Sequence, residues 1–113
     1  MNTRENCEFV DNKRDFDETL QAKDRVIALF YASWCPFCRR FLPIFQQRAE
    51  KKELPFVAVQ DDRETLADQY SVKIYPTVLF IENGVIAKRL DGVSGVGLDE
   101  KKLADFVDLC PSS

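Results

Sequence analysis

The chain has 113 residues, which fits one compact domain spanning 1–113. Apolar residues make up 45% of it, enough for a hydrophobic core that needs no metal or disulfide to stabilise it. The formal net charge of −3 argues against a nucleic-acid partner, and the absence of histidine excludes Ser-His and Cys-His catalysis and zinc sites of mixed Cys/His type. No apolar run approaches the roughly 20 residues of a membrane span and the first six residues are polar, so we expect a cytoplasmic protein without membrane contact.

Strands and helices alternate in the first half of the sequence. A short strand over 7–10 is followed by a weakly amphipathic helix with Asp11 as its expected N-cap. Continuous apolar runs over 26–31 and 56–59 predict strands that are buried on both faces. The helix between them, over about 36–52, carries a single buried stripe, which consists of Cys38, Phe41, Leu42, Phe45 and Ala49.

The second half predicts a short helix over about 63–70, a hairpin, and a last helix from about Leu98. Asn83-Gly84 tolerates the positive φ angles of a tight turn and joins strand 77–82 to strand 85–90. The resulting order, β-α-β-α-β-α-β-β-α, indicates an α/β fold. Its first part should contain parallel strands, and the hairpin adds an antiparallel pair.

Cys35 and Cys38 form a Cys-x-x-Cys pair where strand 26–31 leads into the next helix. The free N–H groups and the positive end of the helix dipole stabilise an anion there, so we expect Cys35 to supply an attacking thiolate. Cys38 lies one turn further on and should be more buried. It can resolve a mixed disulfide by bonding to Cys35, so the pattern predicts thiol–disulfide exchange.

Other interpretations of the cysteines are available. The pair could be half of a zinc site or two inert core thiols, but no second pair completes a zinc site, and Trp34 and Pro36 indicate an exposed, rigid turn. We therefore expect no metal. Cys7 and Cys110 are expected to be buried thiols without a function, with a bridge between them as the alternative.

Several segments, in the same order and at the same spacing, resemble thioredoxins. They are residues 30–38 (Phe-Tyr-Ala-Ser-Trp-Cys-Pro-Phe-Cys), Pro43 as the helix kink, Tyr75-Pro76-Thr77 as the cis-proline loop, Asn83-Gly84 as the hairpin turn and Gly92 as the groove glycine. The likeness runs from about Phe9 to Leu109. It implies a thioredoxin fold, with a central mixed sheet of about five strands flanked by about four helices.

The resemblance also implies the roles of individual residues. Cys35 would be the nucleophile and Cys38 the resolving thiol, and Pro76 would be cis. Substrate would lie against Trp34, Pro36, Phe37, Ile74, Tyr75, Pro76, Gly92 and Val93. The cysteine pair itself carries two electrons, so no metal or organic cofactor is implied. The expected partners are protein disulfide substrates and a thioredoxin-reductase-type electron donor, and the expected state is a monomer that works as a reductant.

Two departures from the thioredoxin pattern concern the cysteines. Thioredoxins carry Gly-Pro between them, whereas Pro36-Phe37 is closer to the Pro-Tyr of glutaredoxins, and this dipeptide tunes the redox potential. The family's buried aspartate, six residues before the nucleophile, is replaced by Leu29, and its lysine partner by Ala58 or Val59. Because that carboxylate helps to deprotonate the resolving thiol, we expect Cys38 to ionise less readily.

Two other functions stay open at this point: a glutaredoxin-like enzyme for glutathione mixed disulfides, favoured by Pro36-Phe37, and a non-catalytic binding module, favoured by Leu29. Arg39 and Arg40 either favour an anion near the cysteines or form a solvated surface pair. The glycine-rich segment 92–97 lacks the spacing of phosphate-binding loops, so we expect a flexible loop at the substrate groove.

Overall fold

The computed structural model describes residues 7–111. Its element order confirms the predicted alternation, with five strands and four helices over this range. The elements are β1 (Cys7–Val10), α1 (Lys13–Ala22), β2 (Arg25–Tyr31), α2 (Pro36–Ala49), β3 (Phe56–Gln60), α3 (Thr65–Gln69), β4 (Thr77–Glu82), β5 (Val85–Leu90) and α4 (Glu100–Asp108). None of these helices is long and apolar enough to cross a membrane.

The strands form one mixed sheet in the order β1-β3-β2-β4-β5. The first three strands pair in parallel, as predicted, and the hairpin pairs β4 with β5 in antiparallel fashion. β4 also runs antiparallel to the central strand β2, with Phe30 opposite Thr77. The sequence had not predicted this pairing, because β4 follows a helix and could equally have been a parallel strand.

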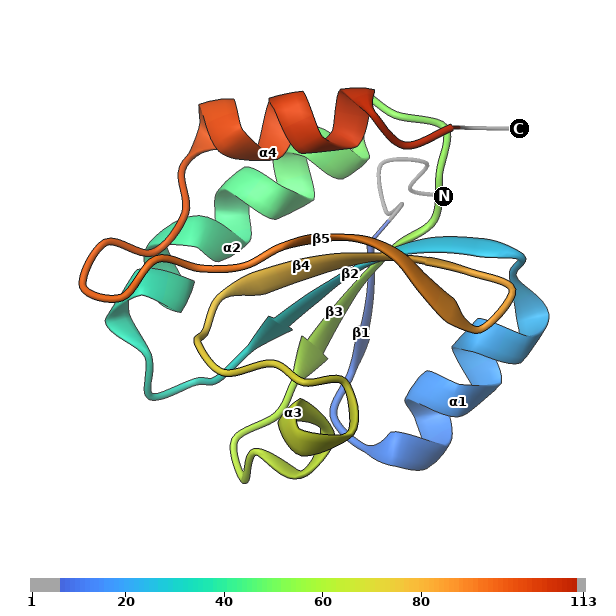
Figure 1. The fold of residues 1–113 in the computed structure, drawn as a ribbon, viewed down its shortest axis with the longest axis horizontal. Helices are drawn as coiled ribbons and strands as arrows, with labels where there is room; N and C mark the ends of the chain where they lie inside the picture. Colours follow the sequence, from blue (N-terminus) through green and yellow to red (C-terminus); the bar gives the residue numbers. More distant parts are fainter. Residues whose placement is uncertain (1–6, 112–113) are drawn as a thin grey trace, which may run out of the picture.

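The sheet lies between two layers of helices, as Figure 1 shows: α2 and α4 cover one face, and α1 and α3 cover the other. Residues 26–31 of β2 are all buried, which explains why this strand reads as an unbroken apolar run. The five aromatic residues Phe41, Phe45, Phe56, Phe80 and Phe106 are buried on the α2/α4 side, and Phe16 and Phe30 are buried on the other side. Both sheet faces thus bury apolar side chains, and the predicted fold class is confirmed.

Two helices begin later than the sequence suggested, each directly after its N-cap residue. Asn12, not Asp11, caps α1, since its side-chain oxygen accepts a hydrogen bond of 2.8 Å from the N–H three residues further on. Asp99 caps α4 in the same way, also at 2.8 Å, so the helix starts after Leu98 rather than at it. Asp11 was an equally plausible cap for α1 on sequence grounds, whereas no cap had been predicted for α4.

The other two helices are shorter than predicted. α2 runs through Pro43 but ends at Ala49, where the N–H of Glu50 bonds to the carbonyl of Gln47 and tightens the last turn. α3 is only five residues long and starts after Glu64, whose φ of 59° is left-handed and cannot extend the helix towards the N-terminus.

Candidate redox site

Cys35 is the N-cap residue of α2, and Pro36 is the first residue of the helix. The cap is the thiol itself: the Cys35 sulfur accepts a hydrogen bond of 3.3 Å from the Cys38 N–H. The same N–H also bonds to the Cys35 carbonyl at 3.1 Å. The position of this sulfur at the N-terminus of the helix, with a backbone donor aimed at it, is the placement that the sequence predicts.

The two thiols are reduced in this structure, and their surroundings differ. Cys35 retains 5% of its surface in contact with solvent and Cys38 only 1%, so the expected order of burial is correct. The Cys35 thiol also faces the carbonyl oxygen of Tyr75 at 3.7 Å. Cys35 is therefore the thiol that an incoming disulfide can reach, and Cys38 lies behind it.

Burial, followed by a hydrogen bond with the Cys35 side chain, raises the pKa of Cys38 to about 12. Leu29 is fully buried in the same apolar cluster as both cysteines and is paired with Ala58 on β3. Ala58 belongs to that cluster, whereas Val59 faces the other side of the sheet, so Ala58 is the residue opposite Leu29 on this face. Asp61 is the one buried carboxylate among the described residues, and it bonds to Leu66, Ala67 and Tyr75 rather than to Cys38.

The loop before β4 faces the cysteines, and its Tyr75–Pro76 bond is cis, as expected. Thr77 is buried and its hydroxyl bonds twice: it donates to the Ile74 carbonyl at 2.6 Å and accepts from the Gly92 N–H at 3.2 Å. A Cβ at Gly92 would clash with the Pro76 carbonyl oxygen. Only glycine allows this close approach of the two backbones, so Gly92 is structurally required here.

Asp61 and Asp62, in the loop between β3 and α3, were not predicted as site residues. The Asp62 carboxylate accepts hydrogen bonds from the Ser33 N–H at 2.7 Å and from its hydroxyl at 2.8 Å. These two donors, together with Gln60, hold the pKa of Asp62 below its usual value. The Asp62 carbonyl accepts the indole N–H of Trp34 at 3.1 Å. This loop therefore fixes the turn that precedes Cys35.

The residues expected to contact substrate differ in exposure. Trp34 is 54% exposed and Val93 44% exposed, while Pro76 and Gly92 are buried and in contact with each other. The 92–97 segment is ordered by backbone hydrogen bonds between Val93 and Gly97, at 2.8 and 3.2 Å. A Cβ at Gly97 would lie 3.0 Å from the Cβ of Phe37, so this loop packs directly on the residue between the two cysteines.

The remaining candidates lie around or away from this cluster. Arg39 donates a hydrogen bond to the Ser33 carbonyl at 3.5 Å, and Arg40 lies 5.5 Å from the centroid of the Phe37 ring. Cys110 is a buried thiol, and burial raises its pKa to about 11, whereas Cys7 is only half-buried, contrary to expectation; the alternative bridge between them is not formed in this structure. Within residues 7–111, no group of three acidic, cysteine or histidine side chains could hold a metal ion.

Comparison with known proteins identifies this arrangement. The family model described as Thioredoxin matches residues 8–108. The chain belongs to the thioredoxin family. A thioredoxin of Mycoplasmoides gallisepticum is 34% identical over 85 residues, which cover 74% of this chain and 85% of that protein. A mutant thioredoxin from Halobacterium salinarum has a similar structure, with a TM-score of 0.77 and 25% identity over 98% of this chain and 99% of that one.

The family also includes larger proteins that contain such a domain. Protein disulfide-isomerase A5 of Bos taurus is 30% identical over 96 residues, but these cover 80% of this chain and only 18% of that protein. The shared segment includes the Cys-x-x-Cys region of the present sequence. Thioredoxin-fold enzymes of both kinds exchange thiols and disulfides through a cysteine pair without a separate cofactor, and the chain is a thiol–disulfide oxidoreductase of this family.

Proposed function

We propose that the protein reduces disulfide bonds in other proteins, with Cys35 as the nucleophile and Cys38 as the resolving thiol. The observation that carries this proposal is the setting of the Cys35 sulfur. It caps α2, accepts a hydrogen bond from the N–H of Cys38, lies beside the Tyr75 carbonyl, and keeps 5% of its residue surface exposed. This arrangement favours a reactive thiolate that a substrate can reach.

In the first step the Cys35 thiolate attacks one sulfur of the substrate disulfide. A mixed disulfide forms between Cys35 and that sulfur, and the other substrate sulfur leaves as a thiolate that takes up a proton. In the second step Cys38 loses its proton to water and attacks the Cys35 sulfur. The Cys35–Cys38 disulfide forms and the second substrate thiolate leaves, so the substrate gains two electrons and the enzyme loses them.

The substrate would dock on the surface around Cys35. Trp34, Phe37 and Val93 would supply apolar contacts, and the backbone of Tyr75 would pair with an extended substrate segment. Pro36, Ile74, Pro76 and Gly92 complete the proposed docking surface. The exposed Val96 of the neighbouring loop enlarges its apolar part.

A dithiol donor must return two electrons to the Cys35–Cys38 disulfide after each cycle. We propose a thioredoxin-reductase-type enzyme for this role, because the family model that matches the chain is that of thioredoxins. A reducing compartment such as the cytoplasm suits this direction of electron flow. In this proposal residues 1–113 act as a single domain and a monomer.

The proposal is tested by measuring the reduction of insulin disulfides with dithiothreitol as the donor. The wild-type protein should accelerate the reaction, and Cys35→Ser should abolish the acceleration. Cys110→Ser serves as the matched control because it removes a buried thiol outside the site and should retain activity. A wild-type rate no faster than that of dithiothreitol alone would contradict the proposal.

Two measurements separate this function from its competitors. A reduction potential of roughly −270 mV for the Cys35–Cys38 couple indicates a reductant, and roughly −120 mV indicates an oxidant. Turnover with glutathione mixed disulfides that survives Cys38→Ser would instead favour a glutaredoxin-like enzyme, since that reaction needs only one cysteine. The reductant proposal predicts that Cys38→Ser stops turnover after the mixed disulfide has formed.

A further inference from the structure

Tyr75 is anchored by its phenol, far from the backbone atoms that face Cys35. The hydroxyl donates to the Asp61 carboxylate at 2.8 Å and lies 3.0 Å from the Asp61 carbonyl oxygen. The hydroxyl has one proton, so these two acceptors share it, and the carboxylate is the stronger of the two. The side chain thus connects the loop before β4 to the loop after β3.

Asp61 is itself held firmly, which makes it an effective anchor. It is one of only two buried polar or charged residues among those described, with 5% of its surface exposed. Its carboxylate also accepts the N–H groups of Leu66 at 3.1 Å and Ala67 at 2.8 Å, in the first turn of α3. Its own N–H bonds to the carbonyl of Tyr31 at 2.8 Å, at the end of β2.

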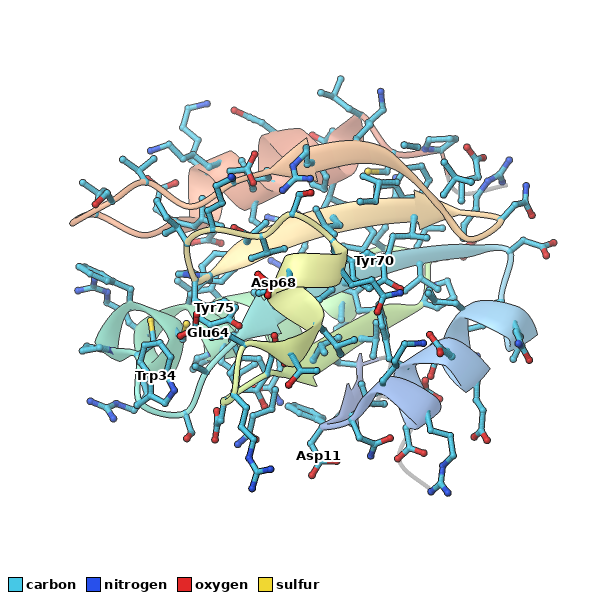
Figure 2. The ribbon with its side chains drawn as sticks, turned by 60° about the horizontal axis from the view of Figure 1, so that its bottom comes forward. Asp11, Trp34, Glu64, Asp68, Tyr70 and Tyr75 are labelled. Atoms are coloured by element: carbon cyan, nitrogen blue, oxygen red, sulfur yellow. The ribbon has the colours of Figure 1, made fainter. Side chains whose placement is uncertain are left out.

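The anchor controls backbone and ring positions at the cysteine site. The Tyr75 carbonyl faces the Cys35 thiol at 3.7 Å, and the Tyr75 ring lies edge-on to Trp34 with their centroids 5.9 Å apart. Figure 2 shows Trp34 and Tyr75 together at one end of the molecule, with Tyr70 on the opposite side of α3. Asp62 holds the turn before Cys35, and Asp61 holds the loop before β4. Two adjacent aspartates therefore fix the two segments that lie beside Cys35.

We propose that the Tyr75 phenol is a positioning group for substrate docking. Through its bond to Asp61 it fixes the backbone of Tyr75 and Pro76, on which the substrate segment would pair, and the ring that supports Trp34. The group does not touch the reacting sulfurs, so its removal should affect the binding of extended protein substrates rather than the thiol chemistry. This inference rests on the proposed function, because it concerns the docking surface of the same site.

The test is Tyr75→Phe, which removes one oxygen atom and keeps the ring against Trp34. We expect KM for a protein disulfide to rise by up to about tenfold, because substrate binding must then order the loop that this hydrogen bond holds in the free protein, while kcat stays within about twofold of wild type. The rate with a small aromatic disulfide, dithiobis(nitrobenzoate), should also stay within about twofold, because it needs no paired backbone.

Tyr70→Phe is the matched control. Tyr70 is also half-buried, but its ring packs on Phe16 and Phe30, away from the cysteines. Both variants are compared with wild type by chemical denaturation, so that kinetic measurements use folded protein. Tyr70→Phe should leave KM unchanged. An unchanged KM in Tyr75→Phe as well, or an equal loss of rate with the protein and the small disulfide, would overturn the proposal.

A second measurement separates this inference from the proposed function. Trp34 is the only tryptophan in the chain, so quenching of its fluorescence by acrylamide reports the solvent exposure of its ring without any catalysis. Tyr75→Phe should increase the quenching and Tyr70→Phe should not. If wild-type protein reduced no disulfide but showed this difference, only the proposed function would fail. If it reduced disulfides and the quenching was the same in both variants, the positioning role would fail alone.

Discussion

The rate at which Cys38 resolves a mixed disulfide should rise about tenfold for each pH unit between pH 6 and 9. The attacking species is the thiolate, and burial, followed by a hydrogen bond with Cys35, raises the pKa of Cys38 to about 12 in the reduced protein. Burial, the largest cause, persists when Cys35 is bonded to a substrate, whereas the contribution of the Cys35 thiol is lost, so the pKa of Cys38 stays raised but by less. Leu29 offers no carboxylate to accept the proton at lower pH.

The size of the effect follows from the pKa. At pH 7 about one Cys38 in 10⁵ is ionised, against about one in 10² for a thiol at the reference value of 9.0. A thiolate of higher pKa is a better nucleophile, and a Brønsted coefficient of about 0.4–0.5 over three units returns about 16- to 32-fold. The net cost at pH 7 is therefore at most about 30- to 60-fold in the rate of resolution, since the Cys35 thiol no longer contributes to the shift in the mixed disulfide.

The assay is a stopped-flow reaction of the reduced protein with dithiobis(nitrobenzoate). Attack by Cys35 releases one nitrothiobenzoate anion, and attack by Cys38 on the resulting mixed disulfide releases a second in a separate, slower phase. Cys38→Ser should remove the second phase only. Cys35→Ser reports any background reaction of Cys7 and Cys110, which is subtracted.

A second phase that levels off below about pH 9 would refute this reasoning, because it would show that an unrecognised base deprotonates Cys38. Leu29→Asp tests the cause directly. A carboxylate there should speed the second phase at pH 7 and flatten its pH dependence, at a cost in stability from the buried charge. Leu29→Ala is the control, since it removes the same buried side chain without supplying a base. It should leave the pH dependence unchanged.

Three further outcomes are expected. The free energy of unfolding should fall about 1 kcal/mol more between pH 8 and 10 in wild type than in Cys110→Ala, because stability from the neutral thiol is complete below pH 9 and is lost as pH rises towards its pKa of about 11. Gly92→Ala should destabilise the protein by about 2–4 kcal/mol in urea denaturation, because its Cβ meets the Pro76 carbonyl. Asp62→Ala should slow insulin reduction about threefold, because the turn before Cys35 loses two hydrogen bonds, while urea denaturation shows that the fold is retained.

The sequence predicted the parts of the site that depend on local pattern. The apolar run over 26–31 predicts a buried strand, and the spacing of Cys35 and Cys38 predicts a pair at the start of a helix. Both patterns involve only neighbouring residues, and the structure has both features. Asp61 and Asp62 were missed because two acids in a loop are ordinarily solvated. Their partners lie far along the chain: Asp61 bonds to Tyr75, 14 residues away, and Asp62 to Ser33, 29 residues away. Their place directly after a buried strand was the available signal.

The topology explains why these distant residues meet at one edge of the sheet. β2 and β3 run parallel, so their last residues, Tyr31 and Gln60, are partners, and the turn to Cys35 lies beside Asp61. β4 runs antiparallel to β2, so it begins at this edge with Thr77, and β5 returns to it at Leu90. A parallel β4 would have placed the Tyr75–Pro76 loop at the opposite edge, about 20 Å away for strands of six residues. The change from parallel to antiparallel pairing at β2 is therefore what brings the loop of Tyr75 and Gly92 to the cysteines.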